Sequence, residues 1–463
     1  MTIDEALTGA AGLAGIQWVL YGAASQCALR EAVTALLHPP ATLGECRLLR
    51  AKAKPGRKLT AYYTLTLNGV AGAVAPTRAI AVTWTLPSSQ ATATAAAPPP
   101  AVMHMEAEAL ASGRAAPFQR LHITNAAWRM QIDVAPLDPT FPQLVSAMTP
   151  THVAAMLAAY GQTPPDSSPA NGWQVTTIRY RPRQRHVLRY DCCAPPTGRT
   201  PIPPFFAKLC RHNEGAQLAT VVDWVAAQLA RSTAGVIALR PQAWVQADQL
   251  LLYPYAPGTQ VSRLLKAGQP VHPLLYRAGA ALRALHVAPP ATLALPRKTF
   301  AGEVKATSQA GEHLALLAPA LSASLCMLLE QVQERYARLP AVEPVFTHSD
   351  FKADHLLADQ EGLTLIDFDS CALADPAADV GKFLADLCWW RASGGQFELA
   401  QAQAAFLAGY GLDHQPDLGA RARLYATLIL AKSTVRRLNL FNESWLAQSQ
   451  TLLNCATALL HSS

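Results

Sequence analysis

The chain has 463 residues, 51% hydrophobic and 15% charged, which is long enough for two or three domains and too apolar for a disordered protein. Eight Lys or Arg residues and one Asp lie between Asn171 and Arg211, and this segment accounts for the whole net charge of +7, so we expect a local anionic partner. There is no apolar stretch of membrane-spanning length, no basic segment before Asp4 and Glu5, and no C-x-x-C pair among nine scattered cysteines, so we expect a reduced cytoplasmic protein without a membrane segment.

The first third of the chain predicts a mixture of helices and strands. Helical spacing covers residues 1–38 and 103–112, a helix is expected at 150–160, and strands are expected at 47–67 around a basic turn, at 79–86 and at 121–134. The Ala/Pro/Ser/Thr-rich stretch 87–102 predicts an exposed linker, and the turn residues at 162–168 predict a domain boundary near residue 165.

The remaining sequence passes from strands to helices. We expect strands at 178–190, 205–209 and 250–255, with a helix at 214–230 between the last two. Further helices are expected at 270–286, 311–338, 398–409, 419–437 and 443–460, and residues 346–368 predict a strand, a loop and a hairpin. A β-rich part followed by a helical part favours two lobes with a ligand cleft between them.

Two basic turns resemble each other. When Pro55 is set against Pro182, basic residues align on both sides of the two turns, and Tyr63 aligns with Tyr190. This is either a coincidence between two basic hairpins or a sign that residues 1–165 include a degenerate copy of the later hairpin.

The strongest chemical signal is the run from His348 to His355, followed by Leu365-Ile366-Asp367-Phe368-Asp369. The intervening residues predict a hairpin that returns Asp367 close to the residues before Leu356. Phosphoryl transfer needs one carboxylate to accept the hydrogen of a hydroxyl and another to hold Mg²⁺ against the phosphates. The alternative is a pair of turn aspartates that cap strands.

These motifs resemble the aminoglycoside phosphotransferase family, which includes sugar and choline kinases and shares its fold with protein kinases. The family reads H-x-D-x-x-x-x-N, then I-D-F, then G-D-P-x-x-D. This sequence has His348, Asp350 and His355, then Ile366 to Phe368, then Ala374 to Asp379. The resemblance covers about residues 175–440 and departs from the pattern at His355 and Ala374.

The resemblance implies a role for each matching residue. Asp350 would be the catalytic base, Lys352 would contact the γ-phosphate, and Asp367 would be the main Mg²⁺ ligand. His355 stands where the family has Asn as second metal ligand, although Mg²⁺ prefers oxygen to imidazole. Asp379 would be structural and brace the loop that carries Asp350.

The nucleotide site is expected in the β-rich part. Lys208 resembles the strand lysine that contacts the α- and β-phosphates in kinase folds, and the downstream motifs favour this role over that of an ordinary lysine at a strand end. Its expected partner on the next helix is Glu214. The resemblance further implies ATP and Mg²⁺ as cofactors.

A basic turn stands where kinases have a Gly-rich phosphate loop. Arg183 and Arg185 on this turn either clasp phosphates through their guanidinium groups or lie on a solvated hairpin. Tyr253 and Tyr255 fall where the family's hinge between the lobes contacts adenine.

The acceptor is expected to be neutral or anionic rather than polycationic. After Trp390 the chain has only four acidic residues against six Lys or Arg. Aromatic residues in the same region either stack on a sugar ring or simply pack between helices, namely Trp389, Trp390, Tyr410, Tyr425 and Trp445. We therefore expect a sugar or related polyol, and maltokinase-like enzymes also carry an extra N-terminal domain.

The sequence thus predicts an α+β protein with a bilobal, protein-kinase-like fold. Residues 1–165 would form an accessory domain, 170–256 the nucleotide-binding N-lobe, and 257–463 the helical C-lobe with the catalytic loop and acceptor site. The expected activity is transfer of the ATP γ-phosphate to a small-molecule hydroxyl. The alternative is a catalytically impaired pseudokinase that binds a nucleotide or a partner, and we do not expect nucleic acid as a partner.

Overall fold

The computed structural model describes residues 1–70, 76–86, 99–161, 172–193, 202–212, 214–290, 293–360, 362–436 and 444–461. The predicted linker at 87–102 and boundary at 162–168 lie mostly or wholly outside these residues. The chain forms two compact units, chiefly Met1–Gly215 with Gln242–Tyr255, and Ala216–Pro241 with Ala256–Leu438 and Glu443–Ser463. The first unit is rich in strands and the second in helices, which confirms the expected α+β class.

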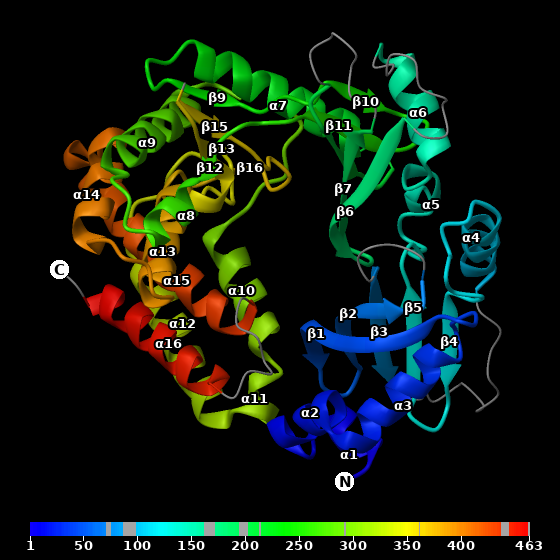
Figure 1. Ribbon diagram of the computed structural model, residues 1–463. Coiled ribbons are helices and arrows are strands. Elements are labelled where there is room, and N and C mark those ends of the chain that lie inside the picture. The colour runs from blue at the N-terminus through cyan, green and yellow to red at the C-terminus, as the bar shows by residue number, and fades with distance from the viewer. Residues whose placement is uncertain are drawn as a thin grey trace. The chain divides into compact units, whose positions relative to one another are not determined.

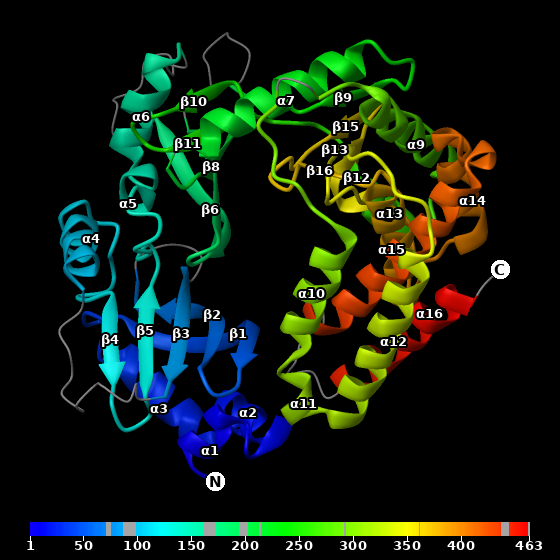
Figure 2. The same cartoon turned by 180° about the vertical axis from the view of Figure 1, so that it is seen from behind.

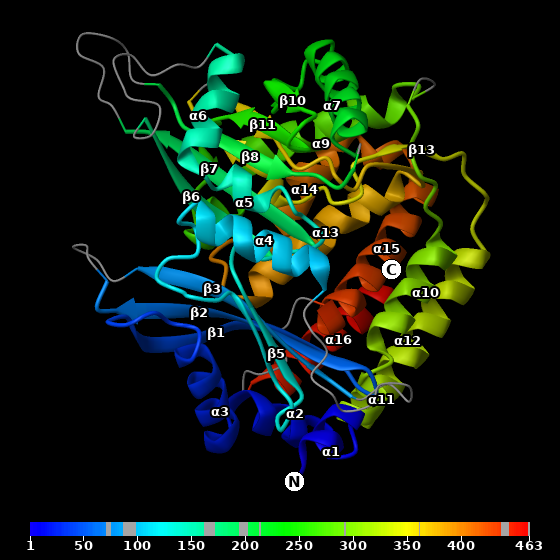
Figure 3. The same ribbon diagram turned by 90° about the vertical axis from the view of Figure 1, so that its right-hand side faces the viewer.

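The first unit begins with three helices that lie against a sheet (Figure 3). They are α1 (Ile3–Thr8), α2 (Gly12–Tyr21) and α3 (Ala23–Thr34). Thr2 and Glu5 form a capping box that starts α1, and Gly9 ends the helix in the left-handed conformation. The predicted helical region at 1–38 is therefore confirmed.

The N-terminal sheet has the strand order β1-β2-β3-β5-β4. Its strands are β1 (Thr42–Lys54), β2 (Lys58–Asn68), β3 (Thr77–Thr85), β4 (His122–Asn125) and β5 (Met130–Val134), and α4 (Pro100–Ala111) lies between β3 and β4 in the chain. Alternate residues of β2 are buried, because side chains on a strand point to opposite faces with period two. This alternation fixes which face of the sheet meets the core.

The second sheet of this unit has the order β10-β11-β8-β7-β6 (Figure 1). It contains β6 (Trp173–Arg181), β7 (Arg185–Cys192), β8 (Phe205–Leu209), β10 (Ala243–Val245) and β11 (Leu250–Pro254). The helices α5 (Leu144–Ala147) and α6 (Pro150–Ala159) share its core. The predicted strands at 178–190, 205–209 and 250–255 are confirmed.

The second unit opens with α7 (Glu214–Ala230), most of which belongs to it, and β9 (Val236–Ala238). A small sheet of order β12-β14-β15-β9 contains β12 (Thr259–Gln260), β14 (Leu356–Ala358) and β15 (Leu363–Leu365), while β13 (Val345–Thr347) pairs with β16 (Ala372–Ala374). The helix at 214–230 begins and ends as the sequence predicts.

Helices make up the rest of the second unit (Figure 2). They are α8 (Val261–Lys266), α9 (His272–Val287), α10 (Phe300–Gly311), α11 (Leu314–Leu317), α12 (Pro319–Ala337), α13 (Ala377–Ala392), α14 (Leu399–Tyr410), α15 (Pro416–Arg436) and α16 (Trp445–His461). The buried helix α15 contacts α10, α12, α13 and α16. The single helix expected at 311–338 is wrong, because a turn after α11 and Pro319 at the start of α12 divide it.

None of the helices in the described residues is long and apolar enough to cross a membrane.

Candidate active site

A short strand leads into the loop that carries the expected catalytic residues. After β13, residues His348–Lys352 form an irregular segment, Ala353–His355 form a single 3₁₀ turn, and β14 follows. The hairpin pairs Leu356 with Leu365, and the Ile366 N–H donates to the His355 carbonyl at 3.0 Å. The prediction that this hairpin returns Asp367 to the start of β14 is confirmed.

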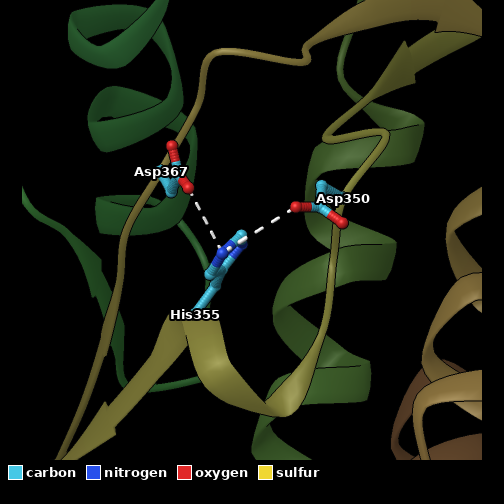
Figure 4. Close-up of side chains that lie close together, drawn as sticks. All are labelled: Asp350, His355 and Asp367. Carbon is cyan, nitrogen blue, oxygen red and sulfur yellow. Dashed lines mark ion pairs between the residues drawn. The ribbon is translucent and has the colours of Figure 1, made fainter. Parts of the chain in front are cut away.

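Asp350, His355 and Asp367 converge on one point (Figure 4). The Nε2 atom of His355 lies 3.3 Å from Oδ2 of Asp367 and 3.8 Å from Oδ2 of Asp350. One ligand atom from each side chain lies within 4.8 Å of the others. The three polar side chains that the sequence singles out on this loop and hairpin are thus brought together.

Asp379 on the first turn of α13 holds the loop in place. Its Oδ2 accepts the His348 N–H at 2.6 Å and its Oδ1 accepts the Ser349 N–H at 2.7 Å, while the carboxylate itself is fully buried. Ser349 has φ 58° and Asp367 has φ 68°, conformations that residues other than glycine rarely adopt. The structural role expected for Asp379 is confirmed, because this carboxylate satisfies two backbone N–H groups of the strained segment.

Two lysines flank the Asp350 carboxylate. The Lys352 Nζ donates to Oδ2 at 2.6 Å, and the Lys382 Nζ lies 3.4 Å from Oδ1. Burial would raise the pKa of Asp350, but Lys382, His355 and Lys352 outweigh it and lower the pKa to about 2. The carboxylate is therefore ionised and can accept a hydrogen bond from a hydroxyl.

Sequence reasoning overlooked Lys382. A usable signal was present, because Asp379, Lys382 and Asp386 recur every three or four residues and so share one face of α13. Asp386 on this face accepts the Ala353 N–H at 3.2 Å and the indole N–H of Trp390 at 3.1 Å. This face of α13 therefore supports the segment at two further points, through Lys382 at Asp350 and through Asp386 at Ala353.

The donor set of this cluster suits a divalent cation. Burial and the Lys352 ammonium lower the pKa of His355 to about 3, although Asp367 and Asp350 favour its charged form. A neutral imidazole offers a lone pair, and the Asp367 carboxylate offers the oxygen that Mg²⁺ prefers. A nitrogen–oxygen separation of 3.3 Å is close to the value of about 3 Å expected for neighbouring ligands around Mg²⁺.

The expected nucleotide residues lie in the first unit. Lys208 is on β8, where it pairs with Val187 of β7 and Leu251 of β11. Glu214 starts α7, and its Oε2 accepts the Arg211 N–H at 3.3 Å. The roles expected for Lys208 and Glu214 stay predictions. Tyr253 on β11 and the exposed Tyr255 just after it likewise stay predicted hinge residues.

The basic turn between β6 and β7 is held by a residue that the sequence gave no reason to select. Asp138 is fully buried, and its Oδ2 accepts the Arg183 N–H at 2.6 Å and lies 2.7 Å from Nε2 of the fully buried His186. Arg183 has φ 62°, and its carbonyl accepts a hydrogen bond from Arg211. The turn that carries Arg183 and Arg185 is therefore anchored by Asp138, although the role of these arginines in binding stays a prediction.

The aromatic residues expected near the acceptor separate into two groups. Tyr410 and Trp445 are buried, and the Tyr410 hydroxyl bonds Nδ1 of His286 at 2.9 Å, so both pack within the helical unit. Trp389 and Trp390 are half-buried, and the Lys266 ammonium lies over the ring of Trp390. Tyr425 is largely buried but lines a pocket beside Asp350. Packing thus accounts for two of the five.

Comparison with protein families gives a match over just under half of the chain. Residues 197–425 match the model of the Phosphotransferase enzyme family, a range that includes the cluster around Asp350. The family resemblance expected from the sequence is thereby confirmed over these residues. No curated protein sequence matches the chain.

Solved structures give more distant likenesses. A choline/ethanolamine kinase family protein from Mesorhizobium loti is 17% identical, with coverage of 59% of this chain and 85% of that chain and a TM-score of 0.42. The GDP and kanamycin complex of APH(2")-IIia is 16% identical, with coverage of 66% and 98% and a TM-score of 0.46. Choline kinase from Cryptosporidium parvum is 10% identical, with coverage of 62% and 89% and a TM-score of 0.43. Likenesses this distant leave the acceptor open.

Proposed function

We propose that this protein is a small-molecule kinase that moves the ATP γ-phosphate to a hydroxyl group, a proposal supported by the match of residues 197–425 to the phosphotransferase enzyme family. The observation that carries the proposal is the convergence of Asp350, His355 and Asp367 on one point. The loop before them is held by the buried Asp379. Such preorganisation is what phosphoryl transfer asks of a protein, because positioning and electrostatic stabilisation supply most of its catalysis.

Asp350 orients the acceptor. Its ionised carboxylate accepts the hydrogen bond of the attacking hydroxyl and takes the proton as the new phosphate ester forms. A pKa of about 2 makes Asp350 a weak base, which suits a loose transition state in which the hydroxyl loses its proton late. Lys352 and Lys382 limit the carboxylate to few orientations and place positive charge where the transferred phosphoryl oxygens pass.

Asp367 and His355 would hold the divalent cation, with Mg²⁺ as the proposed ion. When bound, the ion neutralises the charge on the nucleotide phosphates. The neutral imidazole makes the site softer than one built from oxygen ligands alone. In the first unit, Lys208 would contact the α- and β-phosphates with Glu214 as its partner, and Tyr253 and Tyr255 would lie at the adenine.

The anchored basic turn would take over the work of a Gly-rich loop. Arg183 and Arg185 would clasp phosphate oxygens through guanidinium N–H groups. The anchor supplied by Asp138 supports this role, because it restricts the turn before any ligand arrives. Residues 1–165 would thus belong to the nucleotide lobe in function. We further propose that they contain a degenerate copy of its opening hairpin.

The acceptor would be a sugar or related polyol that is neutral or anionic, and not a polycation. The basic residues that outnumber acidic ones after Trp390 support this proposal. All nine cysteines lie in the described residues and no disulfide joins any two of them, which supports a reducing, cytoplasmic location.

The deciding experiment is ATP turnover in Mg²⁺ with a panel of sugars and polyols, for the wild-type chain and Asp350→Asn. We expect the wild type to release ADP and form a phosphate ester, and Asp350→Asn to lose about 10²–10⁴-fold in kcat, the usual contribution of a positioned base. Nucleotide binding without any turnover by the wild type would contradict kinase activity and favour the pseudokinase.

The lysine assignment is tested separately. Lys208→Met is expected to raise KM for ATP at least tenfold, because it removes a charged hydrogen-bond donor to phosphate. The matched control is Lys305→Met, which removes an exposed lysine on α10. Equal KM values in the two variants would remove Lys208 from the nucleotide site.

A further inference from the structure

A pocket of about 450 Å³ opens beside the Asp350 carboxylate, wholly within the helical unit. It is formed by the start of α10, the His348–Lys352 loop, α13 and α15. Tyr425, Leu428 and Ile429 of α15 give it an apolar wall. The volume suits a small molecule, and the wall suits its carbon skeleton. The charges on the remaining walls therefore bear on which small molecules fit.

Positive charges outnumber negative ones around this pocket. The lining cations are Lys298, Lys382, Lys432 and Arg436, and the lining carboxylates are Asp350 and Glu303. Each carboxylate already has a lysine beside it, since the Lys432 Nζ donates to Glu303 at 2.5 Å and the Lys382 Nζ lies 3.4 Å from Asp350. The pocket lining therefore carries two more cations than carboxylates.

Lys298 keeps donor capacity for a ligand. Its Nζ donates to the neutral carbonyl of Ser370 at 2.8 Å, while an ammonium group has three donors. Arg436 at the end of α15 carries the planar fork of N–H groups that matches carboxylate and phosphate. These two side chains supply the donor types that an anionic group needs.

The pKa of Glu303 indicates the electrostatic potential inside the pocket. This half-buried carboxyl group has a lowered pKa, because Lys432, Lys298 and Arg436 together outweigh the effect of burial, which would raise it. The three cations thus favour negative charge at one place on the pocket wall. A ligand anion near Glu303 would experience the same attraction, and a ligand cation would be repelled.

We propose that the phosphate acceptor carries an anionic group, a carboxylate or a phosphate, in addition to the hydroxyl that is phosphorylated. This inference rests on the proposed kinase function and names its substrate class. The anionic group would bind at Lys298 and Arg436 while the hydroxyl lies at Asp350. The same charges disfavour amino sugars and quaternary amines, because the pocket offers them no unpaired carboxylate.

Matched acceptor pairs test the proposal directly. Glucose is compared with gluconate, with glucose 6-phosphate and with glucosamine, so that carboxylate, phosphate and ammonium are each set against the neutral parent. The measured quantity is kcat/KM for ester formation. We expect at least one anionic acceptor to exceed glucose tenfold or more, and glucosamine to be the poorest. Which anion is preferred distinguishes a carboxylate acceptor from a phosphorylated one.

Two variants that should change the anionic-to-neutral ratio of kcat/KM in opposite directions make the test specific. Arg436→Gln should lower the anionic-to-neutral ratio of kcat/KM by about tenfold or more, the effect of one charged hydrogen bond. Glu303→Gln removes a negative charge from the wall and should raise the same ratio. Lys305→Gln, which alters an exposed lysine on the same helix α10 outside the pocket, should leave it unchanged.

The outcomes separate this inference from the proposed function. Ester formation from neutral or cationic acceptors, with a ratio that Arg436→Gln does not move, would refute the anionic acceptor and leave the kinase intact. Absence of ester from every acceptor would count against the kinase, and the pocket would then be judged by binding alone. Gluconate or inorganic phosphate should raise Tm of the wild type more than that of Arg436→Gln, and equal shifts would overturn the site.

Discussion

Replacement of Asp379 by Asn should destabilise the helical unit more than any comparable change of a surface aspartate. Asp379 is fully buried and accepts two backbone N–H groups, from His348 at 2.6 Å and from Ser349 at 2.7 Å. Nε2 of His286 also lies 3.3 Å from its Oδ2. Asn keeps one acceptor oxygen and turns an NH₂ group toward the other N–H, so one hydrogen bond is lost and a buried donor is left without a partner.

The expected loss of stability in Asp379→Asn follows from the hydrogen bonds that the substitution removes. A hydrogen bond to a charged group contributes about 1.5–3 kcal/mol, and an unsatisfied buried donor costs about 1–3 kcal/mol, so we expect a loss of about 3 kcal/mol in the free energy of unfolding. For a unit of this size that loss corresponds to about 6–12 °C in Tm. Because Ser349 directly precedes Asp350, phosphate transfer should fall as well.

The assay is scanning calorimetry of the full chain beside Asp223→Asn, which makes the same chemical change in an exposed pair. Asp223 and Arg240 have side chains 56% and 60% exposed, so that variant should lose about 1 kcal/mol or less. Equal Tm values for the two variants would refute the reasoning that Asp379 holds the loop.

Three further predictions concern other parts of the molecule. His355→Asn replaces an imidazole by an oxygen ligand, so it should lower the ratio of the Mg²⁺ concentration to the Mn²⁺ concentration that gives half-maximal turnover. Metal titrations that give the same ratio for the variant and the wild type would exclude His355 as a ligand. Gly409→Ala should cost about 1–3 kcal/mol or more in urea unfolding, because the added Cβ would overlap the backbone of α9, while Gly302→Ala, which meets only one side-chain oxygen, should be near neutral. The hydrogen bond to Asp248, partly opposed by burial, raises the pKa of His152, so the stability it contributes is complete below about pH 6.5 and lost as pH rises through the folded-state pKa; the difference in Tm between wild type and His152→Gln should be larger at pH 5.5 than at pH 8.5.

The local sequence pattern was enough to predict the hairpin that brings Asp367 to His355. The hairpin after His355 was predicted because a turn between two short apolar runs can only bring its ends together, and Asp367 accordingly lies at 3.3 Å from His355. The helix at 214–230 was predicted from apolar spacing alone. In each case the controlling interactions lie within about twenty residues of each other.

The features that the sequence did not predict are contacts between residues that lie far apart in the chain. Asp138 lies 45 residues before the Arg183 N–H that it accepts, and no periodicity links the two. The pocket beside Asp350 joins Lys298 to Arg436 across most of the helical unit. Counting charges after Trp390 predicts a neutral or anionic acceptor, which stays a prediction, and it could not place the pocket, because only tertiary packing sets which cations face one cavity.

The weak likeness between the two basic turns has a counterpart in the sheets. The N-terminal sheet runs β1-β2-β3-β5-β4 and the second runs β6-β7-β8-β11-β10, with a helix after the third strand in each. Tyr63 and Tyr190, aligned through the turns, are both buried, at 1% and 0% exposure. A shared strand order and a shared core position support the proposal that residues 1–165 contain a degenerate copy.

The same alignment shows that such a copy would lack the lysine that Lys208 provides in the second sheet. It sets Thr60 on β2 against Val187 on β7, and the strand partners of these residues are Thr83 and Lys208. Both partners lie on the third strand of their sheets, yet threonine supplies no cation for a phosphate. A second nucleotide site in the N-terminal sheet would therefore lack its central charge, so binding should saturate at one nucleotide per chain, and calorimetric titration giving two would contradict the correspondence.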